Sequence, residues 1–143
     1  MADMLATLTS CSFRVKDIDA FKAWFEGYQF GYGVELYVDT HGYVSFAGEE
    51  SCAYPRRKDA DDNIQDVDDL KAFSHELCAH LEDGELLNIV ACGHENYRYA
   101  FFDQLIIAKA HPDHPIYRCG TSDLDYEGCM RLIETESAIA KNG

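Results

Sequence analysis

The stretch ELLNIVACGHENYRYAFFDQLIIAKAHPDHP, residues Glu85 to Pro115, decides the fold because it contains the longest apolar runs of the chain. Two segments rich in aromatic and β-branched residues flank a cluster of turn-forming residues, Gly93 to Asn96. Such segments favour strands, and the run Leu105 to Ala108 suits a central strand that is covered on both faces. A buried helix is the competing interpretation, because short apolar runs do not separate the two. We therefore predict a hairpin that ends at Pro112 and Pro115.

Two amphipathic helices are expected before this hairpin. The first follows Asp17, which is a suitable N-cap, and its apolar residues recur at intervals of three and four. The second is predicted from about Asp66 to Leu81, with Asp66 or Asp68 as its cap and Gly84 just beyond its end. The two apolar stripes are Ile18, Phe21, Trp24, Phe25 and Tyr28, and Val67, Leu70, Phe73, Leu77 and Leu81. We interpret both stripes as core.

The remaining segments add strands and one more helix. We predict a strand over 5–15, a hairpin over 34–46 with its turn at Thr40 to Gly42, a polar loop over 48–63, a short strand over 116–119 and a third helix after Ser122. The order is β-α-β-β-α-β-β, with a possible added strand and a terminal helix. It predicts an α+β fold: a single-domain two-layer sandwich of a mostly antiparallel sheet with two or three helices, loosely ferredoxin-like.

Size and composition restrict the class of protein. A chain of 143 residues with 47% hydrophobic residues fits one globular domain with its own core. No stretch approaches eighteen consecutive apolar residues, and the first ten residues lack the pattern of a secretory signal. The six cysteines are spread singly, which suits reduced thiols better than a disulfide framework. We therefore expect a cytoplasmic protein.

The charge is the most informative property of the chain. Twenty-six acidic residues against twelve basic ones give a formal net charge of −14. This balance excludes nucleic acid and anionic membranes as natural direct partners, because both would repel the protein. It leaves solubility, cation binding, or docking onto a strongly basic protein. In size and charge alone, the chain is similar to the small acidic anti-CRISPR and anti-restriction proteins of phages and plasmids, which would place it in a bacterial host cytoplasm.

An acidic surface is the first candidate site. Carboxylates are dense from Asp59 to Glu85, and a spacing of seven residues would align Asp69, Glu76 and Asp83 on the outer side of the second helix, roughly 10 Å apart. Such a surface would imitate nucleic-acid phosphates and dock into a basic groove, whereas the alternative is a solvated face. Tyrosines and an arginine at the start of the second strand of the predicted hairpin form a second predicted contact, for which half-buried tyrosines on a sheet are the alternative. The predicted contact residues are Asp59, Asp61, Asp62, Asp66, Asp69, Glu76, Asp83, Tyr97, Arg98 and Tyr99.

Other chemistries are less favoured. A zinc or ligand site would use Cys92, His94, His111 and His114, but the predicted hairpin separates the first two residues from the last two. The segment 59–63 lacks the glycine and glutamate of an EF-hand, and nothing beyond adjacency supports Cys92 as a nucleophile. Walker, dinucleotide-binding, hydrolase and zincin motifs are absent from the sequence. We therefore expect an inhibitory binding protein without cofactor, not an enzyme; a metal- or ligand-binding domain is the alternative, and a homodimer through a sheet edge stays open.

Overall fold

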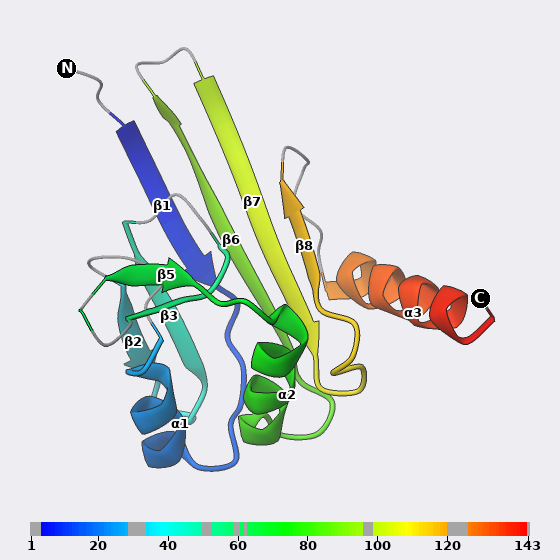
Figure 1. Ribbon diagram of the computed structural model, residues 1–143. Helices are drawn as coiled ribbons and strands as arrows, with labels where there is room; N and C mark the ends of the chain where they lie inside the picture. Colours follow the sequence, from blue (N-terminus) through cyan, green and yellow to red (C-terminus); the bar gives the residue numbers. More distant parts are fainter. Residues whose placement is uncertain are drawn as a thin grey trace.

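The computed structural model describes residues 4–28, 34–49, 53–58, 61, 63–95, 99–119 and 126–142. These segments contain eight strands and three helices, whose arrangement Figure 1 shows. In chain order they are β1 (Met4–Ser10), α1 (Ile18–Phe25), β2 (Glu35–Val38), β3 (Val44–Gly48), β4 (Arg56–Lys58), β5 (Ile64–Asp66), α2 (Leu70–His80), β6 (Leu86–Glu95), β7 (Tyr99–Ala108), β8 (Ile116–Cys119) and α3 (Tyr126–Asn142).

Six strands form one antiparallel sheet in the order β2-β3-β1-β6-β7-β8. The first four positions reproduce a ferredoxin-like arrangement, because α1 connects β1 to β2, α2 lies between β3 and β6, and β3 and β6 both pair with β1. The predicted central hairpin extends this unit: β6 pairs with β7 from Leu86↔Ala108 to Glu95↔Tyr99, and β8 adds the edge. The predicted α+β fold with a mostly antiparallel sheet is confirmed.

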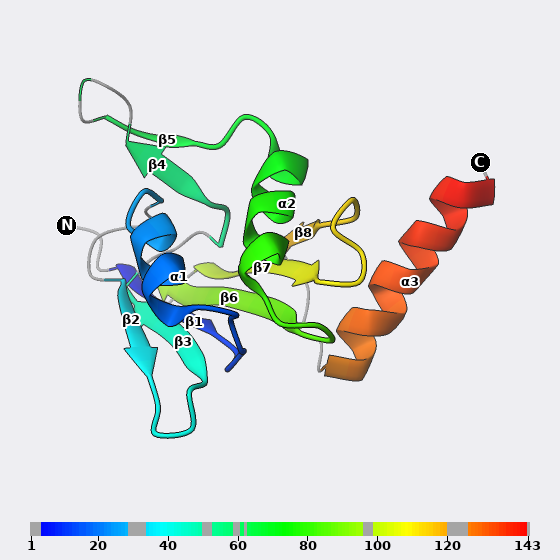
Figure 2. The same cartoon turned by 90° about the horizontal axis from the view of Figure 1, so that it is seen from below.

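The sheet separates two apolar clusters of unequal size. Side chains alternate along a strand, so Leu87, Ile89, Leu105 and Ile107 pack beneath α1 and α2, and their neighbours face the other way. Figure 2 shows α1 and α2 together on one side of the sheet. On the other side, Leu86, Ile106 and Ala108 meet Cys129 and Ile133 of α3, which are also buried. The main core therefore lies between the sheet and the first two helices.

The β2–β3 turn forms where the sequence predicts it. The Asp39 carboxylate accepts hydrogen bonds from the amides of His41 (2.8 Å) and Tyr43 (2.9 Å). These amide donors, that of Tyr43 first, hold the pKa of Asp39 below its ordinary value because they stabilise the charged form. Gly42 supplies the positive φ of +83° that the turn requires. The turn is thus closed by a carboxylate as well as by glycine.

The structure corrects the prediction between residues 48 and 70. The segment predicted as a loop contains β4, which pairs with β5 in a separate two-stranded ribbon, and Arg56 forms an ion pair with Asp66 at 3.3 Å. The buried Val67 donates its amide to the carbonyl of Pro55, which keeps this part of the chain extended. The second helix therefore begins at Leu70, not near Asp66, and neither Asp66 nor Asp68 caps it.

Two further boundaries differ from the prediction. The helix α2 ends at His80, and its C-cap residue Leu81 is extended, so Gly84, with φ of +82°, belongs to the following turn and is not the helix C-cap. The first strand ends at Ser10; beyond it only isolated bridges, Phe13↔Val44 and Val15↔Leu81, continue the pairing. In both places backbone pairing to a neighbouring segment outweighs the local sequence signal.

Candidate interaction surface

Helix α1 is positioned by its predicted cap and by a broad aromatic stripe. The Asp17 side chain accepts a hydrogen bond from the Ala20 amide, and Phe21 is fully buried. The next aromatic residues, Trp24 and Tyr28, are only partly buried, since they lie at the rim of the core where α1 meets α2. Their rings are 5.4 and 5.0 Å from the ring of Phe73 in α2. Aromatic surface therefore reaches solvent between the two helices.

The carboxylate of Glu76, in α2, is hydrogen-bonded to the partly buried aromatic side chains between the two helices. The exposed Glu76 accepts hydrogen bonds from the Trp24 indole N–H (3.4 Å) and the Tyr28 hydroxyl (3.1 Å). Partial burial, followed by the hydrogen bond to the carboxylate, raises the pKa of Tyr28 above its ordinary value. We call Trp24, Tyr28, Phe73 and Glu76 the seam. The sequence predicts Trp24 and Tyr28 in the core and Glu76 on the outer side of α2, so it does not predict the contact between them.

The acidic residues of α2 lie at its ends and not along its length, which corrects the predicted acidic row. Asp69 is the N-cap, and its carboxylate accepts from the Ala72 amide. Asp83 lies beyond the last helical residue, because α2 stops at His80. The exposed side of the helix carries Lys71 and His75 as well as Glu76.

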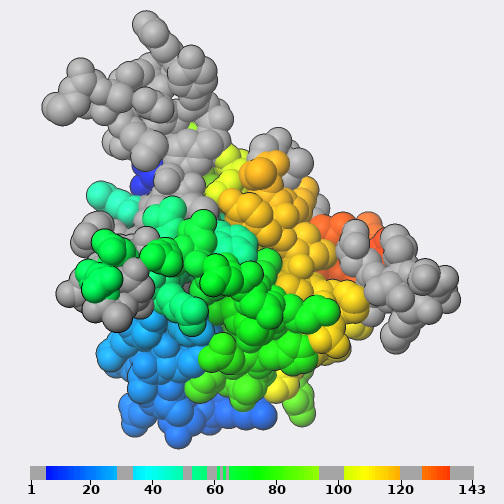
Figure 3. All heavy atoms as spheres, in the orientation of Figure 1, coloured from blue at the N-terminus to red at the C-terminus, as the bar shows by residue number. Residues whose placement is uncertain are grey.

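The ends of α2 nevertheless present exposed carboxylates. They are Asp66 and Asp68 before the N-cap and Asp83 after the C-cap, whereas the neighbouring Glu82 is half-buried. Asp66 is paired with Arg56, whereas within the residues that the structure describes Asp68 and Asp83 make neither an ion pair nor a hydrogen bond through their side chains. Figure 3 shows α1 and α2 next to each other on one face of the molecule. We call this face, with the segments that flank α2, the helical face.

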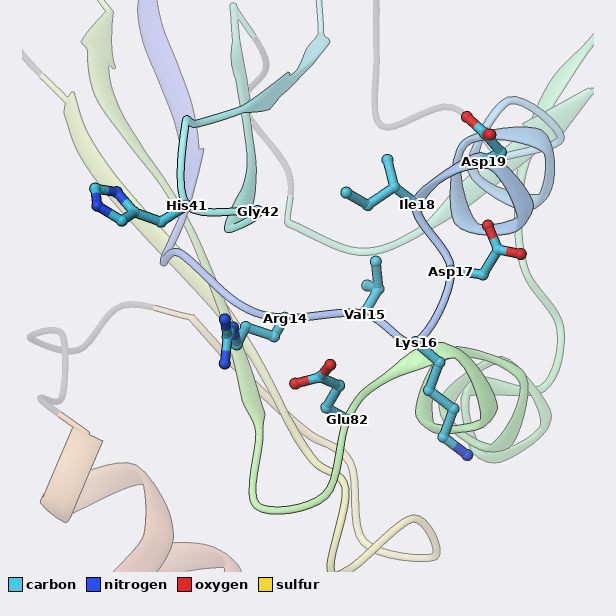
Figure 4. Close-up of a pocket in the computed structure, with 9 residues that line it drawn as sticks. All are labelled: Arg14, Val15, Lys16, Asp17, Ile18, Asp19, His41, Gly42 and Glu82. Carbon is cyan, nitrogen blue, oxygen red and sulfur yellow. The ribbon is translucent and has the colours of Figure 1, made fainter.

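A surface cleft of about 420 Å³ opens beside the start of α1. It collects carboxylates of Asp17, Asp19 and Glu82 with the cationic side chains of Arg14 and Lys16, and the β2–β3 turn completes it. Figure 4 shows that these charged groups do not converge: His41 points away, and the aspartates lie on the side opposite Arg14. The Arg14 guanidinium instead lies 5.0 Å from the centre of the Tyr43 ring. The cleft adds acidic groups to the helical face but is not arranged around a ligand.

Several predicted contact residues fall outside what the structure describes. Asp59, Asp62, Tyr97 and Arg98 lie outside the described residues, and Tyr99 is described only through the backbone of β7. Asp61 is exposed in the turn between β4 and β5. Of the ten predicted contacts, the structure therefore brings Asp66, Asp69, Glu76 and Asp83 to the helical face.

The candidate metal ligands are far apart along the central hairpin. Cys92 pairs with Phe102 towards one end of β6 and β7, while His111 and His114 follow Ala108 at the opposite end; for His94 only the backbone is described. In the described part of the chain, no three histidine, cysteine, aspartate or glutamate residues are grouped as a metal site would require. The hairpin therefore separates these ligands as the sequence predicts.

One polar contact had no signal in the sequence. His75 of α2 and Asp113 of the β7–β8 connection meet at 2.6 Å between Nε2 and Oδ1, and the hydrogen bond from His75 lowers the pKa of Asp113. Beside them the buried Ser74 hydroxyl donates to the Pro112 carbonyl at 2.7 Å, and Lys109 donates to the Cys78 carbonyl. We call these three contacts the latch. They attach the β7–β8 connection to α2.

Comparison with known proteins adds no family to this description. Neither protein-family models, curated proteins nor solved structures match the chain. Among the described helices, none has the length and apolar character needed to span a membrane.

Proposed function

We propose that this chain is a small acidic interaction protein that binds and inhibits a basic nucleic-acid-binding protein or complex. The observation that carries the proposal is the position of the charge: the net charge is −14, and the exposed Asp68 and Asp83, which make no ion pair in the described structure, flank the two ends of α2. Between them lies the partly exposed aromatic seam. Tryptophan and tyrosine are enriched among residues that dominate binding energy, so the face combines long-range attraction with a desolvated centre.

The expected mode of inhibition is competition for a groove that normally holds DNA or RNA. The eleven residues of α2 span about 16 Å, so the carboxylates at its ends are separated by several phosphate spacings of a nucleic-acid strand. A groove lined with lysine and arginine would attract both ends of the helix at once. Association would be fast at low salt and would weaken as salt screens the charges. An anti-CRISPR or anti-restriction role is the expected class.

The test compares two charge-reversed variants with the same net charge. Asp68→Lys with Asp83→Lys changes the helical face at two carboxylates that make no contact within the described structure. Glu49→Lys with Glu134→Lys is the matched control, because these exposed residues follow β3 and lie on α3, away from α2. Each protein is used to capture partners from a bacterial lysate at low and at high salt. Captured proteins are identified by mass spectrometry and assayed for nucleic-acid binding with and without the acidic protein.

The expected result is a nucleic-acid-binding protein captured at low salt and released at high salt. The helical-face variant should lose this capture, and the control should keep most of it. The captured protein should also lose its nucleic-acid binding when the wild-type chain is added. Equal loss of capture in both variants would show that only total charge matters, and a partner whose nucleic-acid binding is unaffected would reject the inhibition.

A further inference from the structure

The Glu76 carboxylate is held in place without being neutralised. Its two oxygens each accept one hydrogen bond, from the Trp24 indole and from the Tyr28 hydroxyl, and both donors are uncharged. Neutral donors fix the direction of a carboxylate but leave its full negative charge. Among the described residues, no lysine or arginine lies within ion-pair distance of Glu76. The seam thus contains an oriented, exposed carboxylate without an ion pair in the described structure. The positive charge of Arg57 is close enough to act on the Tyr28 hydroxyl, whose pKa is raised by burial and by Glu76 and partly lowered by Arg57.

Two aromatic side chains, Trp24 and Tyr28, flank the Glu76 carboxylate. The Trp24 and Tyr28 rings are 5.0 Å apart with a tilt of 47°, and both are only partly buried. Arg57, in strand β4 of the two-stranded ribbon, forms an isolated backbone bridge with Tyr28. Its side chain is exposed and does not form an ion pair with Glu76. The Trp24 ring also packs against the rings of Phe73 and His80, so the seam offers an outside cation a carboxylate flanked by two partly exposed aromatic side chains.

We propose that the seam of Trp24, Tyr28 and Glu76 binds the guanidinium group of an arginine from the partner. This inference rests on the proposed function, since it assigns the centre of the helical face to one side chain of a basic protein. Arginine fits better than lysine because its planar group donates paired hydrogen bonds to a carboxylate and stacks on aromatic rings. The ammonium group of lysine is a compact, strongly hydrated charge that gains less from the two rings.

The seam contains its own reporter, because Trp24 is the single tryptophan of the chain. Its indole N–H is the group that donates to Glu76, so its NMR resonance reads the site directly. The probes are two capped peptides of equal length and charge, one with three arginines and one with three lysines between glycines. We expect the arginine peptide to shift the indole resonance in a saturable way and to bind more tightly than the lysine peptide.

Two neutral variants with equal net charge localise the binding. Glu76→Gln keeps an acceptor for Trp24 or Tyr28 but removes the charge that the guanidinium needs, and it should weaken the arginine peptide by about tenfold. Asp83→Asn removes one charge at the end of α2 and should weaken it less than twofold. Urea unfolding of both variants checks that the fold is retained.

Three results would overturn the arginine site. They are an indole resonance that does not move at saturating arginine peptide, equal effects of the two variants, and equal binding of the two peptides. Each of these outcomes leaves the proposed function intact if, in the lysate experiment, wild-type protein captures a nucleic-acid-binding partner and the variant Asp68→Lys with Asp83→Lys does not. The converse also separates them: a saturable arginine site without any inhibited partner would retain the site and reject the function.

Discussion

At the scale of single residues, three carboxylates with the same spacing in sequence have three different roles. Asp69 accepts from the Ala72 amide and satisfies one of the free N–H groups at the start of α2. Glu76 joins α2 to α1 through the seam, whereas Asp83 has no side-chain contact in the part of the chain that is described. Only Asp83 of the three is therefore free to serve as charge alone.

The cap role of Asp69 can be separated from its charge. Asp69→Ala removes the acceptor and should lower the free energy of unfolding by about 1 kcal/mol, as is typical for loss of an N-cap. Asp69→Asn keeps an acceptor oxygen and should cost at most a few tenths of that amount. Urea denaturation of both variants measures the difference. Equal destabilisation by alanine and asparagine would mean that charge near the helix end, not the cap hydrogen bond, stabilises α2.

At the scale of elements, the sequence predicted those whose signals are local and unopposed. Asp17 directly precedes Ile18, the first residue of the amphipathic stripe, and α1 begins where expected. Before α2, several aspartates compete as caps, and the choice depends on the pairing of β5 with β4. Those strands have three residues each, too few for an alternating pattern to be visible. The first residue of α2 and the positions of the acidic residues around it therefore could not be predicted.

The seam and the latch could not be predicted for a related reason. Both join segments that are distant along the chain: Glu76 is 48 residues from Tyr28, and His75 is 38 residues from Asp113. The apolar stripe of α1 held a partial signal, since four large side chains on this eight-residue helix and Tyr28 just beyond it are not all buried by the core. Nothing in the sequence identifies the partner of an exposed histidine.

The latch predicts how stability depends on pH. His75 lowers the pKa of Asp113, first through its hydrogen bond and then through charge, with smaller contributions from Lys71 and His114. A folded pKa below the unfolded value of about 3.9 gives stability that is present above that value and is lost as the pH falls through the folded pKa. Asp113→Asn should therefore be less stable than the wild type at neutral pH, and the gap should close in acid.

Denaturant unfolding at a series of pH values between 7 and 2 tests this expectation. The control is Glu134→Gln, which removes an exposed carboxylate of α3 that makes no contact in the described structure. Its difference from the wild type should stay nearly constant over the same range. A gap between wild type and Asp113→Asn that persists unchanged at the lowest pH would show that the latch does not depend on the aspartate charge.

At the scale of the whole molecule, fold class and charge were readable from the sequence, but strand order was not. The order of elements along the chain indicated an antiparallel α+β sandwich, and the pairing of β1 between β3 and β6 gives it the ferredoxin-like form. The β1–β6 pairing, from Met4↔Glu95 to Ser10↔Ile89, joins residues that are 79 to 91 positions apart in the sequence, so only tertiary contacts select it. Folding also holds the excess carboxylates of a chain with net charge −14 within a smaller volume than the unfolded chain does.

A net charge of −14 in one small domain should make the folded state sensitive to salt. The native state holds its charges closer together than the unfolded chain does, so their mutual repulsion favours unfolding. The screening length falls from about 30 Å at 0.01 M salt to about 8 Å at 0.15 M. The melting temperature should therefore rise between these concentrations of sodium chloride, with most of the gain below about 0.1 M, where the screening length is still above about 10 Å.

The charge-reversed variants make this expectation specific. Both double lysine variants reduce the net charge equally, so both should gain less from salt than the wild type if repulsion is spread over the molecule. A smaller gain only for Asp68→Lys with Asp83→Lys would place the repulsion at the ends of α2, where a basic partner would relieve it on binding. A melting temperature that is flat or falls with salt would show that favourable ion pairs, such as Arg56 with Asp66, outweigh the excess of carboxylates.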